Sequence, residues 1–174
     1  MPQPGLLQVY TGEGKGKTTA AIGLAVRALG QGLRVLLVRL LKPAEPPSGE
    51  VLFLEGTPNL EILTAGVGIL GPRLDPEAVT ASVAATLAGA RERILAGTVD
   101  LVVFDEGNNA LHHGYLDLDA FLALLDARPP FVEVIVTGRR APERLLERAD
   151  LVTRMEAVRH PLSAGITARQ GIEF

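Results

Sequence analysis

The residues best suited to chemistry in this sequence form a short loop rich in glycine and lysine. Residues 11–19 read Thr-Gly-Glu-Gly-Lys-Gly-Lys-Thr-Thr, after an apolar run at residues 6–10. Glycines let backbone N–H groups turn around phosphate oxygens, Lys17 supplies a point charge, and the Thr18 hydroxyl can reach Mg²⁺. The pattern predicts a phosphate-binding loop. We assign the nucleotide contacts in it to Gly12, Glu13, Gly14, Lys15, Gly16, Lys17, Thr18 and Thr19.

The loop departs from the usual spacing G-x-x-x-x-G-K-[ST], because Thr11 stands where the first glycine is expected. The nearest glycine is Gly12, so the loop is one residue shorter. A shorter loop presents fewer N–H groups to a phosphate, or presents them differently. We therefore predict that a bound triphosphate lies here in an unusual pose. The alternative interpretation is a glycine-rich turn with two solvated lysines.

Two carboxylates, Asp105 and Glu106, end another apolar run. Mg²⁺ prefers hard oxygen ligands beside phosphates, so Asp105 or Glu106 is predicted to hold it together with Thr18. The alternative is an acidic pair that only ends a strand. Arg139 follows a further apolar run, where its guanidinium could support the phosphates or lie solvated in a turn.

The composition is that of a folded protein with one core. The chain has 174 residues, of which 47% are hydrophobic and 21% charged, so we expect a single domain over residues 1–174. Its formal charge of −3 argues against a nucleic-acid partner. It contains no cysteine, which excludes disulfides, thiolate metal sites and a thiol nucleophile.

Targeting signals are not evident in the sequence. The first residues lack the basic and apolar regions of a secretory signal, and no apolar run approaches the roughly 18 residues of a membrane span. We therefore expect no membrane association and a cytoplasmic location.

Apolar runs and helical patterns alternate along the chain. The runs suit strands covered on both faces and lie at residues 6–10, 35–41, 60–63, 101–104, 132–136 and 151–152. Helical patterns lie at residues 17–29, 76–96, 118–125 and 142–149. Asp75 is predicted to cap the second helix, and Asp117 and Asp119 the third.

This alternation predicts an α/β fold with a doubly wound, mostly parallel sheet and helices on both faces. Ligands bind at the carboxyl ends of such strands, where the phosphate loop and Asp105 would meet. Segments 42–49 and 64–73 are rich in proline and glycine and are predicted as loops that border the site.

Taken together, these motifs resemble the ATP:corrinoid adenosyltransferases, a family with a P-loop, RecA-like fold. The similarity covers residues 7–174, nearly the whole chain. It rests on residues 11–21 and 102–106, on Ala127-Arg128-Pro129-Pro130 and residues 136–139, and on the ending Val158-Arg159-His160-Pro161, Ala164-Gly165-Ile166 and Gly171-Ile172-Glu173-Phe174. A generic ATPase would not share that ending.

The resemblance implies transfer of the 5′-deoxyadenosyl group of ATP to the Co(I) of a corrinoid, with triphosphate leaving, in adenosylcobalamin synthesis or salvage. Reduced cobalt is itself the nucleophile, so the protein must only hold C5′ in line and stabilise the triphosphate. Residues 12–18 would bind the triphosphate, Thr18 and Glu106 would hold Mg²⁺ with Asp105 nearby, and Arg139 would support the phosphates. The resemblance also implies that the protein forms a homodimer and that a reductase supplies electrons to the corrinoid.

The corrinoid side departs from the family pattern. Relatives carry Phe-Thr-Trp after Gly-x-Gly, whereas residues 66–71 here read Gly-Val-Gly-Ile-Leu-Gly, and the chain has no tryptophan. In the family these aromatic residues are thought to displace the lower cobalt ligand so that Co(II) can be reduced. We expect Gly68, Ile69 and Leu70 to lie on the corrinoid side, with the two aliphatic side chains supplying the apolar face.

Two alternative functions stay open on the sequence. One is an ATP-binding paralogue without corrinoid chemistry, acting as a regulatory or partner-binding module. The other is a P-loop hydrolase or kinase, whose product would be ADP or phosphate and never triphosphate.

Overall fold

The computed structural model describes residues 4–67, 75–161 and 165–172. The predicted corrinoid-side residues Gly68, Ile69 and Leu70 lie outside this range. In chain order the elements are β1 (Leu7–Thr11), α1 (Lys17–Gly30), β2 (Val35–Pro43), α2 (Gly49–Leu54), β3 (Leu60–Gly66), α3 (Pro76–Leu95), β4 (Leu101–Asp105), α4 (Gly107–His112), α5 (Leu118–Ala127), β5 (Glu133–Thr137), α6 (Glu143–Leu146) and β6 (Leu151–Arg154).

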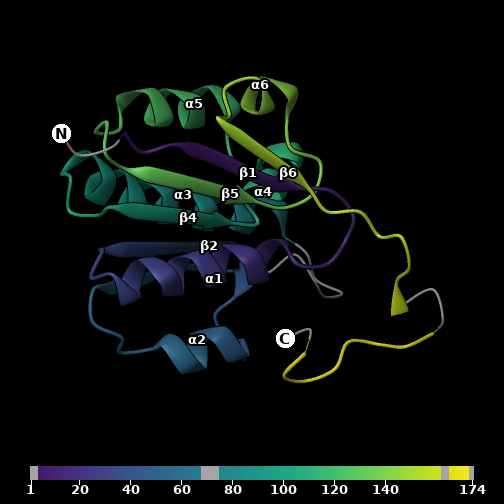
Figure 1. Ribbon diagram of the computed structural model, residues 1–174. Helices are drawn as coiled ribbons and strands as arrows, with labels where there is room; N and C mark the ends of the chain where they lie inside the picture. Colours follow the sequence, from purple (N-terminus) through teal and green to yellow (C-terminus); the bar gives the residue numbers. More distant parts are fainter. Residues whose placement is uncertain (1–3, 68–74, 162–164, 173–174) are drawn as a thin grey trace.

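Within the described residues, six strands form one sheet in the order β3-β2-β4-β5-β1-β6 (Figure 1). Every neighbouring pair is parallel. Parallel neighbours need crossover connections, and helices supply most of them here. The predicted α/β fold with a doubly wound parallel sheet is therefore confirmed.

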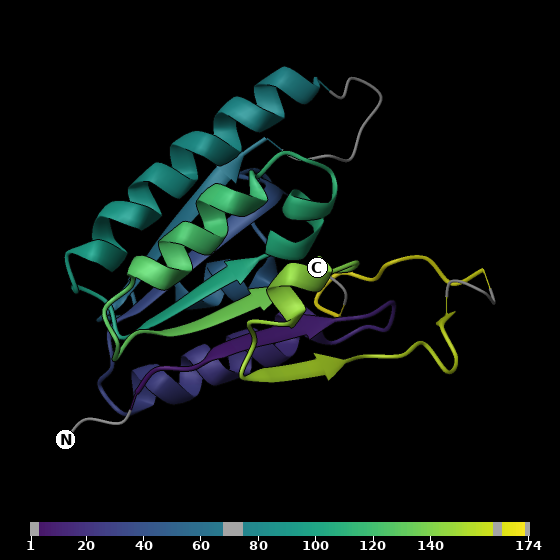
Figure 2. The same ribbon diagram turned by 90° about the horizontal axis from the view of Figure 1, so that it is seen from above.

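Helices cover both faces of the sheet, as the continuous apolar strands require. Leu37, Val103 and Ile135 pack on the side of α1. Their neighbours Leu36, Phe104 and Val136 pack on the side that carries α3, α4, α5 and α6. Figure 2 shows the long α3 and the shorter α5 side by side over this second face.

Several predicted boundaries were wrong. Two short helices, α2 and α4, were missed, and the helix predicted at residues 142–149 is only the four-residue α6. Residues 64–66, predicted as loop, continue β3. The strand β6 extends to Arg154 and all of its residues are exposed, so it is not covered on both faces as predicted.

The helix caps agree with the prediction in two of three cases. The Asp75 carboxylate accepts the N–H groups of Glu77 and Ala78, and the Asp117 carboxylate accepts that of Ala120.

Asp119 was predicted as a cap, but its carboxylate instead pairs with Arg144 at 2.7 Å. The reason is geometric, because Asp117 already occupies the position before α5 and Asp119 lies within its first turn.

None of the helices within the described residues is both long and apolar enough to cross a membrane.

Candidate nucleotide-binding site

The predicted phosphate loop lies between the carboxyl end of β1 and the start of α1. Gly12 and Gly16 adopt φ values of 100° and 116°, a region open to glycine at little cost. A Cβ at Gly12 would run into the Met155 carbonyl, and one at Gly14 would lie 2.7 Å from the Glu156 carbonyl oxygen. These glycines are therefore required by packing as well as by the turn.

The chain that follows β6 supports the loop from behind. Met155 donates its N–H to the Thr11 carbonyl at 2.8 Å, and its own carbonyl accepts the Gly14 N–H at 2.8 Å. The Gly14 amide is thus used within the protein. The loop consequently offers one amide fewer to a phosphate, in line with its short spacing.

The loop lysines both donate to carbonyl oxygens. Lys17 Nζ lies 2.7 Å from Gly12 O and 2.6 Å from Gly14 O. Lys15 Nζ lies 2.9 Å from Ile172 O, which brings the C-terminal segment against the loop. Burial lowers the pKa of the Lys17 ammonium, and the nearby Arg139 guanidinium lowers it further. An anion at this position would relieve that repulsion.

A hydroxyl-carboxylate cluster joins the loop to the neighbouring strands. Asp105, at the end of β4, is only 1% exposed. Its Oδ1 accepts hydrogen bonds from the hydroxyls of Thr18 and Thr137, each at 2.7 Å. Lys42 Nζ lies 3.3 Å from its Oδ2. The cluster therefore brings the predicted residues Thr18 and Asp105 into contact and adds two residues that the sequence did not reveal.

Glu106 follows Asp105 in a left-handed conformation, with φ 62°. Its N–H donates to the Thr137 hydroxyl at 3.1 Å. Burial raises the pKa of the Glu106 carboxyl, and the adjacent Asp105 carboxylate raises it further, against the opposing effect of Lys42 and Lys17. Glu106 is thus a partly desolvated carboxyl that a nearby cation would stabilise.

Arg139 lies on the turn after β5, and that turn is held by α4. Asn109 Oδ1 accepts the Arg139 backbone N–H. Asn108 donates to the Gly138 carbonyl at 3.0 Å. The Arg139 guanidinium lies 3.4 Å from the Glu13 carboxylate of the loop. The turn therefore places the Arg139 guanidinium beside the phosphate loop.

These residues line one cleft of about 760 Å³ at the carboxyl edge of the sheet. The predicted residues that line it are Glu13, Gly14, Lys15, Gly16, Lys17, Thr18, Thr19, Glu106 and Arg139. Gly12 and the buried Asp105 are not among its lining residues, although Asp105 accepts the hydrogen bond of Thr18, which is one of them.

Segment 42–49 borders this cleft as predicted, since Lys42, Pro43 and Gly49 line it. Sequence reasoning gave no site role to Asn109, His160 and Ile172, which also line it.

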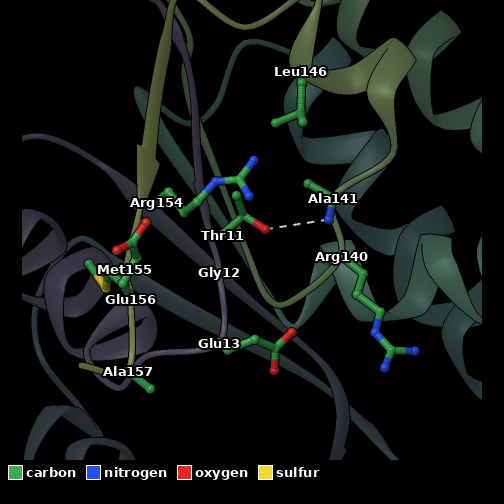
Figure 3. A pocket seen from close by; sticks show the side chains of 10 residues that line it. All are labelled: Thr11, Gly12, Glu13, Arg140, Ala141, Leu146, Arg154, Met155, Glu156 and Ala157. Carbon is green, nitrogen blue, oxygen red and sulfur yellow. Dashed lines mark hydrogen bonds between the residues drawn. The ribbon is translucent and has the colours of Figure 1, made fainter. Parts of the chain in front are cut away.

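A second cavity, of about 510 Å³, lies behind the phosphate loop (Figure 3). We call it the rear pocket, and it is lined by Thr11, Gly12, Glu13, Arg140, Ala141, Leu146, Arg154, Met155, Glu156 and Ala157. Figure 3 shows the Arg154 side chain, from β6, directed into it beside Thr11. Arg140 on its rim contacts His112 at 3.2 Å.

The parallel sheet and the loop between β1 and α1 define the chain as a P-loop α/β protein. A family model described as ATP:corrinoid adenosyltransferase BtuR/CobO/CobP matches residues 3–174. The chain therefore belongs to this family, as the motifs predicted. Membership favours the transferase over the regulatory and hydrolase alternatives.

Curated relatives agree with the family match. The corrinoid adenosyltransferase of Pseudomonas aeruginosa is 40% identical over 170 residues, which cover 98% of this chain and 84% of that protein. The corrinoid adenosyltransferase CobA of Salmonella typhimurium is 36% identical over 170 residues, which cover 98% and 86%. The corrinoid adenosyltransferase of Escherichia coli K12 is 35% identical over 170 residues, which cover 98% of this chain and 86% of that protein.

Proposed function

We propose that this chain transfers the 5′-deoxyadenosyl group of ATP to the Co(I) of a corrinoid. In this reaction the cobalt of the corrinoid attacks C5′, the C5′–O bond breaks, and inorganic triphosphate leaves with the bonding electron pair. The observation that carries the proposal is the contact between Thr18 and Asp105, at 2.7 Å, in a cleft that also holds Lys17 and Arg139. Family membership over residues 3–174 supplies the chemistry.

The donor set of the cleft fits Mg²⁺. The Thr18 hydroxyl and the carboxylates of Asp105 and Glu106 are hard oxygen ligands, and they lie at the end of the phosphate loop. Burial and the adjacent Asp105 carboxylate raise the pKa of Glu106, and a divalent cation bound here would favour its charged form. When bound there with the nucleotide, Mg²⁺ would neutralise charge on the departing triphosphate.

The basic groups of the cleft would hold the triphosphate. We propose that Lys17 exchanges its contacts with the Gly12 and Gly14 carbonyls for phosphate oxygens, and that Arg139 joins it from the opposite side. Since the Gly14 amide is already bonded to Met155, the phosphates would meet fewer loop amides than in a loop of full length. This supports an unusual pose of the triphosphate.

No residue of the protein needs to act as a nucleophile in this proposal. The protein contributes by holding C5′ in line with the cobalt and by preorganising charge around the leaving group. Ile69 and Leu70, outside the described residues, are proposed to cover the lower face of the corrinoid.

The proposal also covers the domain, the oligomeric state, the location and the electron donor of the protein. We propose that residues 1–174 act as one nucleotide-binding domain, that the protein is a homodimer in the cytoplasm, and that a reductase delivers electrons to the corrinoid.

The test is a direct assay with ATP, Mg²⁺ and chemically reduced cob(I)alamin. We expect a light-sensitive cobalt-carbon product and an equal amount of triphosphate. Lys17→Met should abolish product formation while leaving the fold intact, because it removes the phosphate-binding charge. ADP or phosphate as the nucleotide product would contradict the proposal.

A further inference from the structure

The rear pocket is a cavity that the proposed reaction does not use. It lies between the ends of β1 and β6 and the helix α6 (Figure 3). Its volume of about 510 Å³ is in the usual range for sites that bind small molecules. The chemistry of its lining indicates which kind of molecule fits.

An arginine without a protein partner points into the rear pocket. Thr11 and Arg154 are register neighbours in the β1–β6 pair, so their side chains leave the sheet on the same face. Figure 3 shows the Arg154 guanidinium directed into the pocket beside Thr11. Within the part of the chain that the structure describes, this guanidinium makes no hydrogen bond and no ion pair. Its N–H donors are therefore available to a ligand.

The other charges around the pocket leave an excess of positive charge. Arg140 on the rim contacts the His112 imidazole at 3.2 Å, and no carboxylate of the described residues pairs with it. Of the two glutamates in the lining, Glu13 pairs with Arg139 of the nucleotide cleft at 3.4 Å. Two arginines thus remain against the single carboxylate of Glu156. The pocket therefore favours an anion.

The rest of the lining suits a ligand with an apolar body. Thr11 is 4% exposed, and its hydroxyl oxygen accepts the Ala141 N–H at 3.4 Å. The hydroxyl proton is donated to none of the described residues, so it can reach an acceptor in the pocket. Ala141 and Leu146 pack against the hydrophobic core and also line the cavity. Polar donors and aliphatic groups in one cavity match a molecule that joins an anionic head to an apolar body.

We propose that the rear pocket binds a small organic anion. Its carboxylate or phosphate group would contact Arg154 and Thr11, and its apolar body would lie against Ala141 and Leu146. Both head groups present the paired oxygen atoms that a guanidinium recognises with two parallel N–H bonds. The site is separate from the proposed adenosyl transfer and does not depend on it.

The occupant of the rear pocket should also affect ATP binding. Glu13 lines both the rear pocket and the nucleotide cleft. Met155, another lining residue, holds the phosphate loop through the Gly14 N–H at 2.8 Å. An anion behind the loop adds negative charge near a bound triphosphate, and like charges repel. The ligand and ATP should therefore weaken each other's binding, by the same factor in both directions.

The first experiment measures the binding of three matched probes by calorimetry. Benzoate and phenyl phosphate carry the two candidate head groups on the same apolar ring, and benzamide is their neutral counterpart. At least one of the two anions should bind to wild type, and benzamide should bind roughly tenfold more weakly or not at all. The anion that binds identifies the head group.

The second experiment locates the bound anion with variants. Arg154→Met should weaken its binding roughly 10- to 100-fold, and Arg154→Lys should keep part of the affinity because it keeps the charge but not the planar fork. Thr11→Val removes the other head-group contact and should weaken binding roughly 3- to 10-fold, which keeps the proposal testable if Arg154→Met does not fold.

Two control variants should leave the binding of the anion within about twofold of wild type. Arg91→Met removes an exposed arginine of α3 that does not line the pocket. Lys17→Met removes the charge of the phosphate loop, which would hold the probe if it bound in the nucleotide cleft instead.

Several outcomes would overturn the site. They are no binding of either anion, equal binding of benzamide, and anion binding that survives both Arg154→Met and Thr11→Val. Binding that is lost in Lys17→Met but kept in Arg154→Met would assign the probe to the nucleotide cleft and overturn the site as well. Equal ATP affinity with and without saturating probe would overturn the coupling alone. The corrinoid takes no part in these measurements, so the adenosyl transfer is decided separately.

Discussion

The hydroxyl of Thr137 joins the Asp105 carboxylate to the backbone of Glu106, and its removal tests how the proposed metal site is built. Thr137 is fully buried. It donates to Asp105 Oδ1 at 2.7 Å and accepts the Glu106 N–H at 3.1 Å. Thr137→Val keeps the branched shape of the side chain and deletes both interactions.

The expected cost follows from these two hydrogen bonds. A hydrogen bond to a charged group contributes about 1.5 to 3 kcal/mol, and an amide left without its partner costs about 1 kcal/mol. Thr137→Val should therefore lower the free energy of unfolding by roughly 2 to 4 kcal/mol. Thr86→Val is the matched control, since that hydroxyl donates only to the Ser82 carbonyl of its own helix, at 2.9 Å. Its cost should be below about 1 kcal/mol.

The assay is equilibrium unfolding in urea, with and without ATP and Mg²⁺. Thr137→Val should also reduce the stabilisation by ATP and Mg²⁺, because Asp105 and Glu106 are no longer held in place. If Thr137→Val costs no more than Thr86→Val, the hydroxyl does not organise the carboxylates and this reasoning is refuted.

Three further predictions concern the carboxyl, the loop and the corrinoid side. Burial raises the pKa of Glu106 in the folded protein above its ordinary value of 4.5. Between the pKa of the unfolded chain and the higher pKa of the folded protein, the folded state binds a proton that the unfolded chain has lost. The free energy of unfolding therefore falls as the pH rises through this range. Glu106→Gln should remove this loss, so that without ligands it unfolds at higher urea than wild type at neutral pH, while its ATP- and Mg²⁺-dependent activity falls. Gly14→Ala should weaken ATP binding at least tenfold, measured by calorimetry, because its Cβ would press on the Glu156 backbone at 2.7 Å and displace the loop. Ile69→Ser combined with Leu70→Ser should abolish adenosylation that starts from Co(II) and spare that from reduced Co(I).

Each of these predictions has a clear contrary result. A Glu106→Gln protein with the same pH profile of stability as wild type would mean that this carboxyl is not desolvated. Normal ATP binding by Gly14→Ala would mean that the chain after β6 does not restrain the loop. Equal activity of the double serine variant in both corrinoid assays would remove the proposed apolar face.

Much of the fold could be predicted because strands and helices leave local patterns. Continuous apolar runs identified the strand positions, and Asp75 marked the start of α3. The short helices escaped because their sequences carry no such pattern. Leu52 and Phe53 in α2 are exposed, so this helix has no clear apolar face. The helix α4 begins with Gly107 and two asparagines, which are poor helix formers.

The exposure of β6 could not be predicted for a related reason. Its apolar residues Leu151 and Val152 resemble those of a buried strand, and only the position of the strand in the sheet decides whether anything covers it. Strand order depends on crossovers between distant segments, which a local pattern does not record.

The sequence by itself determined the chemistry of the phosphate loop, the carboxylates at the end of β4 and membership of the family, because these depend on residue types at short spacing. The tertiary structure alone decided that Thr137 and Lys42 join Asp105, and that the Gly14 amide is bonded to Met155. These contacts join strands that are far apart in the chain. Their geometry is set by the order and register of the sheet.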